Sequence, residues 1–292
     1  MPRTIAGFIC CAILFSLMTG CGIACTIWAS AGDSVAEKGT IVGKNRDNSP
    51  SLHTRLALVF PVKGFRFLGI LDIEADGYVV AAVNEKGLVV VNASANSVRR
   101  SERHVAVEDV TRRILENFDS VDSLDKQRDF LRKTHPAIYI VADQEKIMSV
   151  EVAPRGNVAI TVKDNGSFAF TNHYTSEGLA DANEKISHES LARFKRINQL
   201  LGGLPGAHTL DDFISLSRDR NSGGPGAMMR VSRKGSKIRT LATWIIRLEP
   251  GSAPTVYVQI FNEGRKPETF AARLDERFWN PEKRQQTVRS KE

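Results

Sequence analysis

The segment Gly22-Ile23-Ala24-Cys25-Thr26-Ile27-Trp28 joins an apolar leader to the body of the chain, with Cys25 at the junction. The leader has a cationic start at Arg3 and an apolar run from Ile5 to Met18, which are the features of an export signal. Small residues close the leader, so we expect a signal peptidase to cut after Ala24. Residues 1–24 are therefore predicted to be a signal peptide, and the mature protein is expected in the periplasm or the medium.

A second processing site competes with this one. Leu17-Met18-Thr19-Gly20-Cys21 approximates a bacterial lipobox, which would attach a lipid anchor to Cys21 and leave Cys25 inside the chain. The two interpretations differ in the residue that becomes the mature N-terminus, so the sequence leaves both open.

An N-terminal cysteine carries a nucleophile and a base in one residue. A free α-amine has a reference pKa near 8, so it can accept the thiol proton at neutral pH. The four cysteines of the chain are Cys10, Cys11, Cys21 and Cys25. Because none lies beyond Cys25, the mature body has no disulfide framework, and its single thiol is available for chemistry.

The composition is that of an ordinary globular domain. The chain has 292 residues, of which 42% are hydrophobic and 25% charged, and this length supports one large core. After the leader no apolar run approaches the roughly 20 residues that cross a bilayer, so no membrane span is expected. The net charge of +7 comes from scattered basic residues and a charged tail, expected to fray from about residue 280. No nucleic-acid motif accompanies this charge, so no nucleic-acid partner is predicted.

Apolar runs separated by turn residues predict a sheet-rich chain. The expected strands are 25–30, 40–45, 56–62, 65–75, 77–83, 87–93, 137–142, 146–153, 157–163, 167–170, 240–248 and 255–261. Apolar residues at helical spacing predict helices over 107–117, 121–133, 189–201, 210–218 and 268–278. Strands and helices that alternate in blocks favour an α+β fold. We expect two sheets, each covered by helices, in a single domain from residue 25 to residue 292.

Five segments of the chain form an ordered set of motifs. They are Cys25-Thr26, Gly43-Lys44-Asn45-Arg46-Asp47, Asn84-Glu85-Lys86-Gly87-Leu88 with Asn92 downstream, Thr171-Asn172-His173-Tyr174, and Ser190-Leu191-Ala192-Arg193-Phe194-Lys195-Arg196. In this order, over about the first two-thirds of the chain, they resemble the choloylglycine hydrolase family and its relatives, the penicillin-maturing acyltransferases. The resemblance implies a four-layer α-β-β-α sandwich with two antiparallel sheets, the N-terminal-nucleophile (Ntn) hydrolase fold. It also implies the hydrolysis of linear carbon–nitrogen amide bonds.

The resemblance also implies roles for the residues around the nucleophile. Cys25 would attack the substrate carbonyl, with its own α-amine as the base. Asp47 would accept a hydrogen bond from that amine, and Arg193 would support both groups from a helix. The family has arginine where this chain has Lys44. Lysine keeps the positive charge but lacks the planar guanidinium that binds a carboxylate through two hydrogen bonds. Arg46 is an alternative for that role if it lies on the same strand face.

The oxyanion of the reaction needs hydrogen-bond donors. By the resemblance Asn172 would donate its amide N–H, and Asn92 would be a second donor. The family's downstream asparagine sits slightly further along the strand, so Ser94 is an alternative to Asn92.

No metal or cofactor is expected. The six histidines are dispersed without ligand spacing, at His53, His104, His135, His173, His188 and His208. The glycine-rich segment 223–226 lacks the residues of a phosphate-binding loop. The expected partner is a small acylated amide, split through a thioester on Cys25, and a homo-oligomer is left open. The alternatives are an acyltransferase that passes the acyl group to an amine, and a non-catalytic surface lipoprotein anchored at Cys21.

Overall fold

A computed structural model describes residues 24–103, 109–231 and 237–280, and these residues form two antiparallel sheets. The first sheet has the order β10-β1-β2-β11-β12-β13, with bounds β1 Thr26–Ala31, β2 Thr40–Asn48, β10 Gly166–Phe170, β11 Arg239–Leu248, β12 Thr255–Ile260 and β13 Glu268–Arg273. The second runs in chain order, with bounds β3 Thr54–Val59, β4 Phe67–Asp72, β5 Tyr78–Asn84, β6 Val89–Ser94, β7 Ala137–Ala142, β8 Ile147–Val152 and β9 Val158–Lys163.

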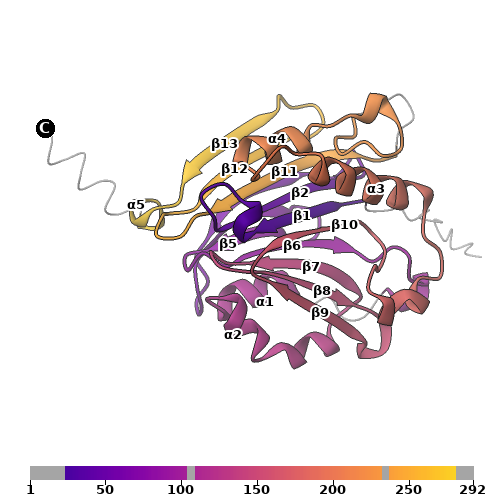
Figure 1. Cartoon of the computed structure of the whole chain (residues 1–292), viewed down its shortest axis with the longest axis horizontal. Helices are drawn as coiled ribbons and strands as arrows, with labels where there is room; N and C mark the ends of the chain where they lie inside the picture. The colour runs from indigo at the N-terminus through magenta and orange to yellow at the C-terminus, as the bar shows by residue number, and fades with distance from the viewer. Residues whose placement is uncertain (1–23, 104–108, 232–236, 281–292) are drawn as a thin grey trace, which may run out of the picture.

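The described helices are α1 Val110–Asn117, α2 Val121–Asp125, α3 His188–Gly202, α4 Leu210–Ser217 and α5 Glu276–Trp279. Helices α1 to α4 cover the outer faces of the two sheets, whereas Trp279 of α5 packs into the core between them. One core lies between the sheets, one between the first sheet and helices α3 and α4, and one between the second sheet and helices α1 and α2. Figure 1 shows these layers stacked as α, β, β and α. The predicted four-layer sandwich is therefore confirmed.

Side-chain alternation along β1 and β2 positions the site, because successive residues of a strand face opposite sides of the sheet. Ile27 packs into the core between the sheets, whereas Trp28 packs under helices α3 and α4. The side of Gly43 that faces Trp28 has no room for a side chain. A Cβ there would lie 2.3 Å from Trp28 Cε2, which explains the glycine that opens the motif 43–47.

Most expected elements match, and one was wrong. Residues 268–278 do not form a helix: 268–273 are the edge strand β13, paired antiparallel with β12, and only 276–279 are helical. The expected helix 121–133 is divided into α2 and a 3₁₀ segment, Arg128–Lys133. The leader before Ala24, the anchor at Cys21 and the tail beyond residue 280 lie outside the described residues. Within the described part of the chain every helix is too short or too polar to span a membrane.

Candidate active site

Cys25 immediately precedes β1, which lies between β10 and β2 in the first sheet. Its side chain is buried, and its carbonyl oxygen accepts a hydrogen bond from Arg193 Nη1. The same nitrogen donates to the Thr26 hydroxyl at 2.8 Å. The Ala24 backbone N–H donates to the Asp47 carbonyl at 3.0 Å, so the backbone just before Cys25 pairs with the backbone of Asp47.

Asp47 is a buried carboxylate with one oxygen unused. Its Oδ1 accepts a hydrogen bond from the Thr240 hydroxyl at 2.7 Å. Its Oδ2 lies 3.5 Å from Arg230 Nε but accepts no hydrogen bond from the described residues. Burial raises the pKa of Asp47 to about 6, and the positive charges of Arg193 and Arg230 limit that rise. A buried acceptor without a donor is costly, so this oxygen is suited to a group that arrives later, such as a free α-amine.

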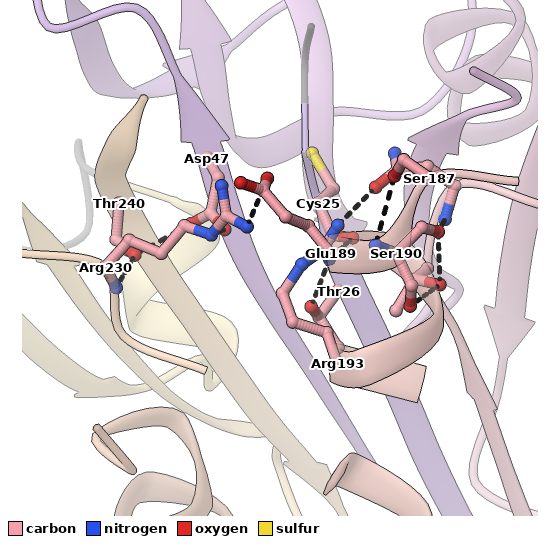
Figure 2. Close-up of polar contacts among 11 residues, drawn as sticks. Cys25, Thr26, Asp47, Ser187, Glu189, Ser190, Arg193, Arg230 and Thr240 are labelled. Atoms are coloured by element: carbon pink, nitrogen blue, oxygen red, sulfur yellow. Dashed lines mark hydrogen bonds and ion pairs between the residues drawn. The ribbon is translucent and has the colours of Figure 1, made fainter. Parts of the chain in front are cut away.

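Arg230 is a site residue that the sequence reasoning missed. Its Nη2 donates to Glu189 Oε2 at 2.8 Å, while its Nε faces Asp47. Figure 2 shows Arg230 between Asp47 and Glu189. Glu189 lies in the first turn of α3, and the hydrogen bond from Arg230 lowers its pKa. Arg230 belongs to none of the five motifs, and no pattern in the sequence pointed to it.

Arg193 connects the nucleophile to the predicted oxyanion donor. From the buried face of α3, its Nη2 donates to Asn172 Oδ1 at 2.8 Å. Burial lowers the pKa of Arg193 to about 10, with the charge of Asp47 opposing the change, so Arg193 stays a cation at neutral pH. Because Asn172 Oδ1 is held by Arg193, its Nδ2 must point the other way, and it donates to Ser94 O at 2.9 Å. Among the described residues the second amide hydrogen has no acceptor.

Lys44 extends from β2 across the space between the sheets to β5 and β6. Its Nζ donates to Val80 O at 2.8 Å, Asn92 O at 2.6 Å and Asn92 Oδ1 at 3.0 Å. Burial lowers the pKa of Lys44 to about 8, and a thiolate at Cys25 would oppose that shift. The lysine that replaces the family's arginine thus uses all three of its N–H groups on neutral oxygens.

Asn92 is oriented by these contacts. Its Nδ2 donates to Val79 O at 3.1 Å and to Thr111 Oγ1 at 2.9 Å, so both of its amide hydrogens are engaged away from Cys25. In this arrangement Asn92 positions Lys44, and its role as a second oxyanion donor stays a prediction. Ser94, the alternative, contributes a backbone carbonyl to Asn172.

Arg46 lies on the same face of β2 as Lys44 but has a different partner. It donates to the Thr54 hydroxyl and forms an ion pair with Asp72. Arg46 therefore fixes β2 to the second sheet, and Lys44 is the cation that lies near Cys25. Both line a cavity of about 80 Å³ beside Cys25, together with Asn48, Asp72, Tyr78, Val80, Asn92, Ala93, Ser94, His135, Pro136 and Ala137.

His173, the residue after Asn172, packs against α3. Its Nδ1 lies 2.8 Å from the Ser190 hydroxyl, and its ring stacks edge-on against Phe194. Within the described residues no group of three or more His, Cys, Asp or Glu side chains is arranged to hold a metal ion.

The fold is a two-sheet sandwich with a buried cysteine at the start of β1 and a buried carboxylate on the neighbouring strand β2. Together with an asparagine fixed by arginine, this arrangement points to the class of Ntn hydrolases. The sequence profile of the acyl-coenzyme A:6-aminopenicillanic acid acyl-transferase family matches residues 34–259. The chain belongs to this family, and the resemblance inferred from the five motifs is confirmed. The match begins after Cys25, so it does not itself include the proposed nucleophile.

Solved structures agree on the fold. A variant of conjugated bile acid hydrolase from Clostridium perfringens superposes with a TM-score of 0.53 at 14% identity, over 85% of this chain and 92% of that chain. Penicillin V acylase from Agrobacterium tumefaciens gives a TM-score of 0.54 at 13% identity, over 88% of each chain. No match was found among curated proteins. Family and fold together place the chain among Ntn-type amide hydrolases and acyltransferases.

Proposed function

We propose that this protein is an exported enzyme that cleaves linear amide bonds with Cys25 as an N-terminal nucleophile. The observation that carries the proposal is the buried Oδ2 of Asp47, which accepts no hydrogen bond from the described residues, on a residue whose backbone carbonyl binds the Ala24 N–H. Removal of residues 1–24 would turn the amide nitrogen of Cys25, one residue from that contact, into an amine. The amine would then supply the hydrogen-bond donor that Asp47 lacks.

The proposed reaction uses each of these groups in turn. The α-amine takes the thiol proton of Cys25, and the sulfur forms a bond to the carbonyl carbon of the substrate. Asn172 donates its second amide hydrogen to the oxygen as it becomes negative. The carbon–nitrogen bond then breaks, the α-ammonium gives its proton to the leaving amine, and an acyl thioester remains. Water, activated by the same amine, attacks the thioester and releases the carboxylic acid.

Acyl transfer is the second candidate, because the name of the matching family describes an acyl-transferase. The two reactions share every step up to the thioester and differ in whether water or an amine attacks it. Adding an external amine to the assay separates them: a transferase converts the amine to an amide at the expense of free acid. A lipoprotein anchored at Cys21 would instead keep the nitrogen of Cys25 in an amide and hold no active base there.

The decisive experiment compares two forms of the protein. One is the full chain expressed in the cytoplasm with residues 1–24 verified intact by mass spectrometry. The other starts with a methionine directly before Cys25, which the cell removes. We expect amide hydrolysis only from the second form, and Cys25→Ala in that form should abolish it without unfolding the protein. Equal activity of the intact precursor would refute the α-amine mechanism.

A further inference from the structure

The cavity beside Cys25 is small and strongly polar. Its volume of about 80 Å³ is well below the roughly 300–1,000 Å³ of pockets that take drug-sized ligands. A water needs at least roughly 10–15 Å³ of such space, so the cavity has room for roughly five to eight water-sized atoms. An acyl group of about that many non-hydrogen atoms fits, whereas a fused-ring or long-chain acyl group does not.

Two side chains that line the cavity have a hydrogen-bond donor with no partner among the described residues. The Tyr78 hydroxyl makes no hydrogen bond within the described residues, and burial raises its pKa, so it stays a neutral donor. Asn48 uses its Oδ1 to accept from the Ser49 N–H, which leaves its amide nitrogen available. On the acceptor side, Asp72 has one unpaired oxygen, but its charge is neutralised by the ion pair with Arg46.

The charge balance of the lining is positive. Arg46 and Asp72 cancel, and Tyr78 is neutral, so Lys44 carries the net charge. The three hydrogen bonds of Lys44 go to neutral oxygens, so none of its hydrogen-bond partners balances its charge. A buried cation without a hydrogen-bonded counter-charge is costly. An anionic group on the acyl chain would supply that counter-charge.

We propose that the cavity beside Cys25 takes a short acyl group that ends in a carboxylate, so that the preferred substrates are half-amides of short dicarboxylic acids. This assignment rests on the proposed function, because it describes the group that forms the thioester. The positive charge of Lys44 and the unused donors of Tyr78 and Asn48 recognise the carboxylate. The size of the cavity limits the length of the acyl chain.

Three p-nitroanilides of equal size test the assignment on the mature enzyme. Their acyl groups are succinyl, succinamoyl and 4-methylpentanoyl, each with seven non-hydrogen atoms and with a terminal carboxylate, amide or isopropyl group. A hydrogen bond to a charged group changes a binding or rate constant by roughly an order of magnitude or more. We therefore expect kcat/KM for succinyl to exceed that for 4-methylpentanoyl by at least about tenfold, with succinamoyl between them. Equal values, or a preference for the isopropyl group, would overturn the assignment.

A pair of matched variants locates the effect. Tyr78→Phe removes only the hydroxyl from the cavity, and it should lower the succinyl to 4-methylpentanoyl ratio by about three- to tenfold. Tyr257 lies on β12, outside the cavity, and its hydroxyl accepts a hydrogen bond from Arg218. Tyr257→Phe removes that hydroxyl and should leave the ratio unchanged. A ratio that is unchanged in Tyr78→Phe, or that falls equally in both variants, counts against the assignment.

Alkylation of Cys25 probes the cavity without any turnover. Iodoacetate and iodoacetamide have the same size and differ in the carboxylate. The rate with iodoacetate is divided by the rate with iodoacetamide, both on the mature protein and on a peptide with an N-terminal cysteine. The normalised ratio is the value for the protein divided by the value for the peptide, and it should be at least about five. A normalised ratio of one or less overturns the cavity assignment whatever the turnover. A ratio in favour of iodoacetate with no anilide hydrolysed supports the cavity assignment and counts against the proposed function instead.

Discussion

Replacing Arg230 by methionine tests whether Asp47 acts as an ionised carboxylate in this site. Asp47 is fully buried, and its charge is opposed by burial and supported by three cations, Arg193, Arg230 and Lys44, and by the Thr240 hydroxyl. Arg230→Met removes the cation that lies 3.5 Å from Oδ2 and keeps an unbranched side chain in its place. The pKa of Asp47, about 6 in the native protein, should therefore rise.

The size of the effect follows from that distance. An opposite charge within about 4–6 Å lowers the pKa of a carboxyl group by roughly 1–3 units, so its loss should raise the acid limb of the kcat/KM profile by about 1–3 pH units. With a pKa of about 6, Asp47 is about 90% ionised at pH 7. A shift of two units would lower that fraction to about 10%, which is a loss of roughly tenfold in kcat/KM at pH 7. The kcat/KM of Arg230→Met should recover as the pH rises, because deprotonation of Asp47 restores the active form.

The assay is the pH dependence of kcat/KM for the mature enzyme on one amide, with thermal unfolding measured in parallel. Arg230→Lys keeps the charge and should shift the acid limb much less than Arg230→Met. Arg196→Met is the matched control, because Arg196 lies on α3 but pairs with Asp219, at 2.7 Å. An acid limb that does not move in Arg230→Met, in a protein that is still folded, would refute the assignment of Asp47 as the ionised partner.

Three other substitutions give direct readouts. Asn172→Ala should lower kcat by roughly 10²–10³-fold with little change in KM, and a wild-type kcat would reduce Asn172 to a structural residue. Lys44→Met should slow alkylation of Cys25 by iodoacetate at pH 7 by at least about tenfold, and Lys44→Arg should retain part of the wild-type rate. An unchanged rate in Lys44→Met would show that the charge of Lys44 does not act on the sulfur of Cys25. Gly43→Ala should destabilise the fold by about 1–3 kcal/mol in denaturant unfolding, because its Cβ would overlap the Trp28 ring, and an unaltered midpoint would show that the ring moves freely.

Much of the fold could be predicted because its information is local. Strands such as β5, β6 and β7 are continuous apolar runs bounded by turn residues, so their positions are readable without knowing their neighbours. The segment 268–278 failed for the opposite reason. Its spacing allows a helix, but β12 offers a free edge with which residues 268–273 pair, and that edge is not visible in the local sequence.

The same contrast between local and distant information applies to the residues of the candidate site. Cys25, Asp47, Asn172 and Arg193 could be named because each lies in a motif with recognisable neighbours. What the motifs could not give is direction: the amide of Asn92 faces Val79 and Thr111 because Lys44, from the other sheet, occupies its oxygen. Orientation of a side chain depends on partners that are distant in sequence, so it had to come from the structure.

Arg230 shows why a further residue of the site stayed hidden. A buried carboxylate such as Asp47 requires positive charge nearby. The sequence offered an obvious source in Arg46, next to Asp47 on the same strand. Strand alternation sends Arg46 to the opposite side of the sheet, where Asp72 takes it. The charge instead comes from Arg230 in the segment before β11, held by Glu189 from α3. Because the requirement is set by burial and is met from wherever the fold brings a cation, the need for such a residue was predictable but its position was not.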